Sequence, residues 1–310
     1  MSRVRNMDIA FAYNTTVPDL VSTLGYRNTI DPLHIYMGNP LLRNSHSHTT
    51  TYNYHRMWLR KQIVLGFTAS YNKDINPQAT LYSYNSATGV YTSKPMNVKG
   101  GDMWQFAFNY DQGIGFYFRL MNKFALETAK SYGFLTIVDN NAADAQPELN
   151  KQKRLGINND FEFSYETEKL QLTLFDRLES NRYRYDDASY NTTPLFNSVG
   201  ISANLHLAPF EVFVQLSDDY CSGYATSAMN GHKLKSMASV SWSFCKNKCM
   251  LRLFADDIFN KDIWYESEYS AFQRQEYSTN YIHHYLNLSF RYRLDAKAKK
   301  GKSTTISSRR

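Results

Sequence analysis

Apolar and polar residues alternate along most of this chain with a period of two, which is the period of a β-strand. In one stretch Trp104, Phe106, Phe108 and Tyr110 interleave with Met103, Gln105, Ala107 and Asn109. In the last such stretch Leu286, Leu288, Phe290, Tyr292 and Leu294 interleave with Tyr285, Asn287, Ser289, Arg291 and Arg293. An apolar face of this kind packs on a core in a soluble sandwich, or faces lipid in an outer-membrane barrel with a wet interior.

The alternation predicts about twelve strands, of the length expected for an antiparallel transmembrane β-barrel. We expect the first strand at Arg5 to Tyr13, followed by a long irregular segment from Asn14 to Ser45. The other strands are expected at 46–57, 61–84, 90–110, 114–130, 151–166, 169–185, 195–208, 210–221, 235–245, 249–266 and 276–294. Several exceed the five or six residues typical of soluble domains, and we interpret the excess as hairpin that projects beyond the membrane.

The predicted connections are short and long in turn along the chain. The short ones are Asp111-Gln112-Gly113, Thr167-Glu168-Lys169, Ala208-Pro209 and Lys246-Asn247-Lys248. The long ones are Ser131 to Asn150, Asp186 to Pro194 and Cys221 to Leu234. Tight turns at the periplasmic end and long loops at the outer end are typical of outer-membrane barrels, so the connections favour the membrane hypothesis over the soluble one.

Composition adds two constraints on the location of the chain. Mean hydropathy is −0.52, which by itself indicates a soluble protein but does not exclude a barrel, because alternation averages the apolar signal away. Aromatic residues make up 15% of the sequence, which suits the interfacial belts of a barrel or the aromatic core of a soluble all-β protein. No run of about 18 apolar residues is present, so we predict no transmembrane helix. Met1 to Asp8 is polar and charged and holds no signal peptide, so we expect the chain to be a fragment or its true start to lie upstream.

The net charge of +7 is concentrated at the C-terminal end. Residues 295–310 carry six cations and one anion, which gives +5 and leaves +2 for the rest of the chain. We therefore divide the chain into a barrel domain at 1–294 and a basic, disordered tail at 295–310, and we expect no nucleic-acid partner.

The sequence predicts no enzyme, because it contains no nucleophile elbow, zinc-protease motif, Walker loop or dinucleotide turn. No catalytic, cofactor or metal site is expected. His46 and His48 share one strand face but have no evident third ligand, and Asp256-Asp257 reads as lumenal or rim polarity within a strand. Tyr281 and His283-His284 read as interface residues, and a disulfide between Cys245 and Cys249 is left open.

Two segments resemble a known family. Asp31-Pro32-Leu33 and Gly38-Asn39-Pro40-Leu41-Leu42-Arg43, preceded by Pro18-Asp19-Leu20, resemble a segment of the TonB-dependent receptors of Bacteroidetes type, which are outer-membrane β-barrels. That family continues with Lys-Pro where this chain has Arg43-Asn44. Leu251 to Asn260 resembles the family's penultimate strand, and Tyr285 to Leu294 its last strand, with Leu294 in place of the usual Phe.

The resemblance implies the C-terminal part of a barrel of about 22 strands, without the plug, in a nutrient or glycan uptake receptor of the outer membrane. It implies outer-membrane lipid, the barrel assembly machinery, TonB and a surface lipoprotein as partners. The alternatives are a self-contained pore or surface-binding barrel, and a soluble β-rich carbohydrate-binding module. The substrate cannot be read from the sequence. The loop aromatics that could stack on a glycan are Tyr132, Phe134, Tyr224, Tyr269 and Phe272.

Overall fold

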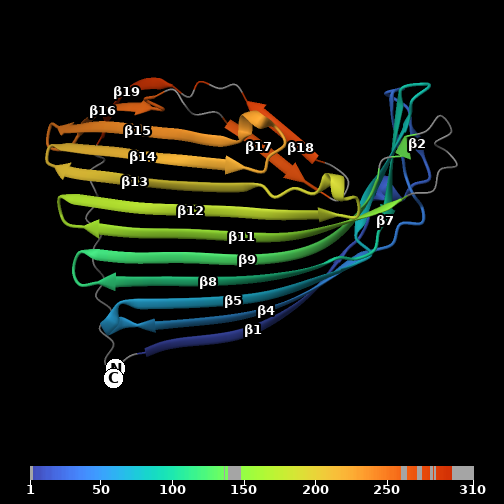
Figure 1. Cartoon of the computed structure of the whole chain (residues 1–310), viewed down its shortest axis with the longest axis horizontal. Coiled ribbons are helices and arrows are strands. Elements are labelled where there is room, and N and C mark those ends of the chain that lie inside the picture. The colour runs from blue at the N-terminus through green and yellow to red at the C-terminus, as the bar shows by residue number, and fades with distance from the viewer. Residues whose placement is uncertain are drawn as a thin grey trace.

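A computed structural model of the chain describes residues 3–135, 137–138, 148–259, 264–270, 274–279, 282 and 284–294. Within these residues, twelve strands form one curved antiparallel sheet (Figure 1). Its order is β1 (Arg3–Thr16), β4 (Ser45–Trp58), β5 (Ile63–Ile75), β8 (Asp102–Ile114), β9 (Phe118–Phe134), β11 (Leu149–Glu166), β12 (Leu170–Tyr185), β13 (Leu195–Leu207), β14 (Phe210–Ser222), β15 (Gly231–Phe244), β16 (Cys249–Asp256) and β19 (Tyr285–Tyr292). The all-β, antiparallel prediction is confirmed. The sheet is not closed, because β1 and β19 form its two edges.

The remaining elements lie mostly in the longer connections. A second, five-stranded sheet has the order β10 (Ile137–Val138), β6 (Gln78–Asn85), β7 (Val90–Asn97), β3 (His34–Met37) and β2 (Arg27–Asn28). β17 (Trp264–Tyr269) and β18 (Arg274–Thr279) form a separate hairpin. The helical elements are α1 (Leu20–Thr23) and single 3₁₀ turns at Leu59–Lys61, Ala188–Tyr190 and Ser227–Met229. None of the helices in the described part of the chain is long and apolar enough to span a membrane.

Strand register divides the main sheet into an outer and an inner face. Phe67 of β5 is opposite Phe108 of β8, which is opposite Phe124 of β9, so the predicted apolar sets fall on one continuous outer face. The inner face is polar and hydrogen-bonded between strands. Gln105 donates to Glu127 at 2.8 Å, and Ser198 donates to the buried Asp219 at 2.5 Å.

The large apolar side chains of this fold do not form a conventional core. Among the described residues, no large side chain is fully buried, whereas outer-face residues such as Phe11, Val199 and Leu288 are more than half exposed. Leaving this much apolar surface in water would forgo about 25 cal/mol per Å² of burial, so the outer face requires an apolar surrounding.

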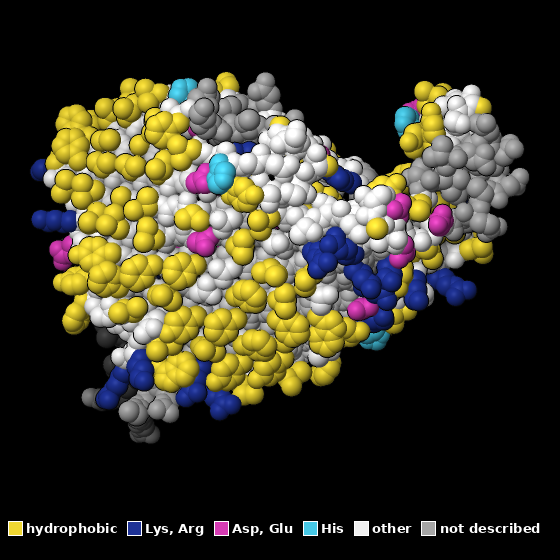
Figure 2. All heavy atoms as spheres, viewed as in Figure 1, with side chains coloured by type: hydrophobic (Ala, Val, Ile, Leu, Met, Phe, Trp, Pro, Cys, Tyr) yellow, Lys and Arg dark blue, Asp and Glu magenta, His cyan; other side chains and the backbone are white. Residues whose placement is uncertain are grey.

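The apolar band crosses the strands obliquely, from β14–β16 at the upper left of Figure 2 to β1–β5 at the lower centre. One row of directly opposed outer-face residues shows why: it runs from Arg56 of β4 to Asp218 of β14. The residues between them are Leu65, Tyr110, Asn122, Phe161, Asp176 and Val199. Strands about 4.8 Å apart and tilted by about 40° rise by about 3 Å per step, so the seven steps of this row span about 20 Å. A lipid-facing belt is about 25 Å tall, so with the usual tilt of barrel strands Arg56 and Asp218 would lie near its opposite borders.

Two predicted strands are wrong because each of them is really two strands in different sheets. The predicted strand 61–84 breaks at Asn76, which has a left-handed φ of 50°, and Pro77, which ends the β5 ladder. The predicted strand 90–110 breaks before β8 at Gly100 and Gly101. A Cβ at Gly100 would lie 1.7 Å from the Asp74 carbonyl oxygen, so only glycine permits this close approach of two backbones.

Other boundaries also differ from the predictions. The predicted 249–266 and 276–294 strands shorten to β16 and β19, with β17–β18 between them, and Asn14 to Ser45 contains α1, β2 and β3 instead of being wholly irregular. The turn predicted at Asp111 to Gly113 lies at Gly115 to Tyr117, because β8 continues to Ile114. The other three short turns are confirmed, and they lie at the end of the sheet opposite the long connections (Figure 1).

Candidate ligand-binding site at the loop end of the sheet

Two cavities lie where the long connections meet the inner face of the main sheet. The first, of about 370 Å³, lies between β12, the β14–β15 connection and β17. The second, of about 620 Å³, lies between β6, β7, β9, β11 and the end of β17. Tyr269, the last residue of β17, lines both of them. The β17–β18 hairpin therefore separates and partly covers a pair of adjoining sites.

The first cavity combines aromatic and polar side chains. Its lining residues are Glu179, Asn181, Tyr183, Pro194, Tyr224, Met229, Glu266, Ser267 and Tyr269. The rings of Tyr183 and Tyr269 stack with centroids 4.6 Å apart, which fixes the hairpin against β12. The Tyr269 hydroxyl is shielded from solvent, and no described residue hydrogen-bonds to it. A buried hydroxyl without a partner costs about 1–3 kcal/mol, so this oxygen is suited to a ligand contact.

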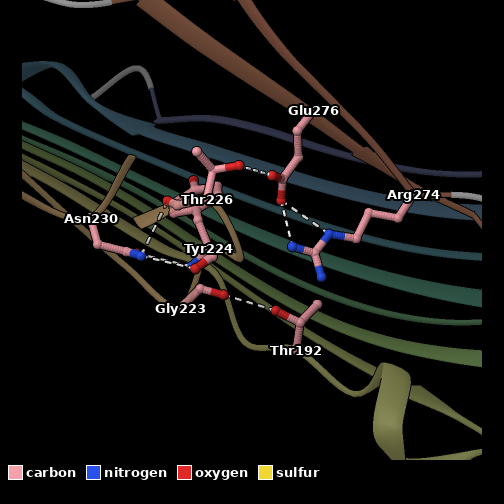
Figure 3. A network of polar contacts seen from close by, with 7 residues as sticks. All are labelled: Thr192, Gly223, Tyr224, Thr226, Asn230, Arg274 and Glu276. Carbon is pink, nitrogen blue, oxygen red and sulfur yellow. Dashed lines mark hydrogen bonds and ion pairs between the residues drawn. The ribbon is translucent and has the colours of Figure 1, made fainter. Parts of the chain in front are cut away.

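A polar network holds the hairpin over this cavity (Figure 3). The Thr226 hydroxyl donates to the Glu276 carboxylate, and the Arg274 guanidinium donates to the same carboxylate at 2.6 and 3.0 Å. Asn230 exchanges hydrogen bonds of 2.9 and 3.0 Å with the backbone of Tyr224. The β14–β15 connection is in turn tied to the β12–β13 connection by the bond from Thr192 to the Gly223 carbonyl, at 2.8 Å. Three long connections thus support one site.

The first cavity is acidic. Glu179 and Glu266 are its two charged lining residues, and neither forms an ion pair with another described residue. The nearby cations already have partners, because Arg274 is paired with Glu276 and Arg154 with Glu127. Burial raises the pKa of Tyr224, and the Glu179 carboxylate adds to that shift. The phenol therefore stays neutral at physiological pH and can both donate and accept a hydrogen bond.

The second cavity is lined by uncharged residues: Ser22, Tyr36, Gln78, Ala79, Thr80, Pro95, Ser131, Tyr132, Gln152, Tyr269 and Ser270. Gln152 donates to the Tyr185 hydroxyl at 2.8 Å, which orients its amide on the inner face. The arrangement offers amide and hydroxyl groups beside aromatic rings, which suits a neutral polar ligand.

The structure brings together three of the five loop aromatics named from the sequence. Tyr224 and Tyr269 line the first cavity, and Tyr132 lines the second. Phe134 is buried with 5% of its surface exposed, and Phe272 lies outside the described residues. Sequence reasoning missed Glu179 and Tyr183, which are strand residues of β12. Both residues lie on the polar face of the predicted strand, at the end next to a long loop, and this position is the feature of the sequence that could have identified them.

The other residues singled out from the sequence do not form a site. Among the described residues, no three His, Cys, Asp or Glu side chains are grouped as metal ligands would be. His46 and His48 do share one face, where Tyr13 donates or accepts a 2.8 Å hydrogen bond with His46 Nδ1. Asp256 ends β16, and Asp257 lies beyond it with a φ of 42°, so the prediction of a paired acid inside a strand is wrong.

The cysteines and the last-strand histidines have simpler surroundings. Cys221, Cys245 and Cys249 are all free thiols, so the possible Cys245–Cys249 disulfide is not formed in this structure. His284 Nδ1 lies 2.7 Å from the Asp257 carbonyl oxygen, just before β19. Tyr281, His283 and the basic tail at 295–310 lie outside the described residues.

Comparison with known proteins gives one match. A family model described as the outer membrane protein beta-barrel family matches residues 2–292, which is nearly the whole chain. No curated protein and no solved structure matches the sequence.

Proposed function

Because the chain belongs to the outer membrane protein β-barrel family, we propose that it acts in the outer membrane as the barrel wall and ligand-capturing part of a nutrient-uptake receptor. Membership of the family implies location in the outer membrane and a structural or transport role. The oblique apolar band of the outer face agrees with that location.

The observation that carries the proposal is the pair of cavities at the loop end of the sheet. They lie on the inner face, under a hairpin that is fixed by named hydrogen bonds and ring contacts. A barrel that only anchored a protein or only passed solutes would have no need for a covered, polar and aromatic site at its mouth. A ligand released from this site would next meet the hydrogen-bonded polar inner wall.

The resemblance to TonB-dependent receptors of Bacteroidetes type supports this proposal and extends it. Under it, TonB supplies energy through a plug, a surface lipoprotein delivers the ligand, and the assembly machinery inserts the barrel. The strands of this chain are then the C-terminal part of a wall of about 22 strands.

A passive pore is the second candidate function, favoured by the polar inner face. Pairs such as Thr49 with Asn72, and Asn53 with both Asp8 and Thr68, give a wall that water can wet. A pore would not need the hairpin, whereas a receptor would. The two candidates therefore differ in what removal of the hairpin should do.

The test compares cells that carry the full chain with cells whose chain has residues 264–279 replaced by a short Gly-Ser linker. Depletion of a panel of nutrients from the medium is followed by mass spectrometry, and outer-membrane abundance is measured in parallel. We expect one class of nutrient to be taken up only with the hairpin present, at equal abundance. Equal, unselective uptake by both would contradict the receptor and support the pore.

Orientation is checked with epitope tags in the same cells. A tag at Asn230, in the loop that carries Tyr224, should be labelled on intact cells, and a tag at Asn247, in the β15–β16 turn, should be labelled only after lysis. The reverse pattern would place the cavities on the periplasmic side and remove the argument for capture.

A further inference from the structure

We propose that the first cavity binds an organic cation, a ligand that carries an alkylammonium or guanidinium group, with Glu179 and Glu266 as its counter-charges. The inference rests on the proposed function, because it names the chemistry of the ligand captured at that site. The proposed cation site is the cavity between β12, the β14–β15 connection and β17. The uncharged second cavity would hold the rest of the ligand.

The charge of the lining is the first observation. Two carboxylates face one cavity of about 370 Å³, and its lining contains no lysine or arginine among the described residues. Arg154 and Arg274, the neighbouring cations, are held by Glu127 and Glu276. Two like charges in a partly enclosed site repel each other, and this repulsion is relieved when a cation enters and increased when an anion enters.

The uncharged lining residues give the second observation. Asn181 donates at 2.9 Å to Glu179 Oε1, which orients that carboxylate along the cavity wall. The shielded Tyr269 oxygen, to which no described residue forms a hydrogen bond, can accept a hydrogen bond from an N–H group of the ligand. Tyr224 and the buried Met229 add polarisable side chains to the lining, against which an alkylammonium group can pack.

A glycan is the competing occupant, and the geometry favours it less. Sugar recognition by stacking needs an open ring face, but the faces of Tyr183 and Tyr269 are stacked on each other at 4.6 Å. The Arg274 guanidinium lies 5.7 Å from the Tyr269 ring centroid and takes up part of that ring as well. An uncharged sugar would also leave the two carboxylates uncompensated.

The test measures binding of spermidine to the full chain in lipid nanodiscs by titration calorimetry, with maltose and citrate as neutral and anionic probes. We expect spermidine alone to bind, and its affinity to fall with rising salt. Glu179→Gln and Glu266→Gln should each weaken binding by about tenfold, and Tyr269→Phe, which keeps the stack on Tyr183, by about threefold. Glu162→Gln is the matched control, because Glu162 is an inner-face carboxylate outside the cavity, and it should leave the affinity unchanged.

Unchanged spermidine affinity in the Glu179→Gln, Glu266→Gln double variant would overturn the proposal, as would binding of maltose in place of spermidine or no binding at all. Binding is measured without transport. A receptor that binds spermidine but takes up nothing would refute uptake and leave the cation site standing, whereas uptake of an anionic or neutral nutrient would refute only the cation site.

Discussion

The two faces of the main sheet are made by the same twelve strands, yet they handle polar and apolar groups differently. On the inner face polar side chains join neighbouring strands, as where Asp219 accepts from Ser198 and lies 3.2 Å from Lys235 Nζ. On the outer face aromatic side chains pack on their neighbours, as where the ring centroids of Tyr71 and Trp104 lie 4.4 Å apart.

The comparison teaches that neither face is a core. The outer face exposes its large apolar groups, and some of its polar residues are paired with each other, as Asn122 with Asn159 and Asp176 with Asn197. In lipid an unpaired polar group costs several kcal/mol, so such pairing lets a polar residue remain on that face. The inner face makes its bonds in the presence of water, where each contributes far less.

The largest expected effect tests the assignment of the faces directly. Phe106→Arg, on the outer face, should destabilise the protein in lipid vesicles by about 2–4 kcal/mol, because it places a guanidinium against hydrocarbon. Gln105→Arg, one residue away on the inner face, should be tolerated, because the new cation would lie beside Glu127. Urea titrations followed by tryptophan fluorescence measure the free energy of unfolding of both variants. Equal losses would contradict the assignment of the outer face to lipid and the inner face to water.

A second pair of variants sharpens the description of the inner face. A Cβ at Gly200 would lie 2.4 Å from Phe175 Cζ and 2.7 Å from the Leu216 carbonyl oxygen, so Gly200→Ala should cost about 1–3 kcal/mol. At Gly66 the nearest atom would be 3.6 Å away, in Asn109, so Gly66→Ala should be neutral or stabilise by about 0.5 kcal/mol. The same titrations report the difference, and a loss at Gly66 as large as that at Gly200 would contradict this packing.

The smallest expected effect compares two adjacent threonines of β4. Thr51 on the inner face bonds to Ser70 at 3.3 Å, so Thr51→Val should cost about 0.5–1 kcal/mol. Thr50 faces outward, opposite Phe11 and Tyr71, so Thr50→Val should be neutral or slightly stabilising. Equal losses of stability in the two variants would contradict this assignment, because they would mean that the Thr50 hydroxyl also forms a hydrogen bond.

The strands and their faces could be predicted because a period of two needs only local sequence. The alternation through Phe106 and Phe108 placed both on the outer face, and the register confirms it. The second sheet could not be predicted in this way, because β3 pairs with β7 from a distant part of the chain. The breaks at Asn76-Pro77 and at Gly100-Gly101 did carry a signal, since these are turn residues, but the continuous alternation on either side concealed it.

The candidate site was predictable only in part, for a similar reason. Tyr224 and Tyr269 stood out as loop aromatics, but nothing local indicates that the hairpin of Tyr269 lies against Tyr183 of β12. Nor does the sequence show that Glu179 and Glu266 share a cavity, because they belong to elements 87 positions apart. Sites made where loops meet depend on tertiary contacts that a strand pattern does not contain.

The close approach at Gly100 and Gly101 also bears on how this protein could diversify. β5 and β8 remain paired up to Lys73 and Asp102, and the Asp74 amide donates to the Gly101 carbonyl at 3.1 Å. The segment that contains β6 and β7 therefore leaves the main sheet and returns to it at the same point. Insertions and exchanges within 78–97 can therefore alter the second sheet while the register of the main sheet stays unchanged, so the two parts are free to evolve at separate rates.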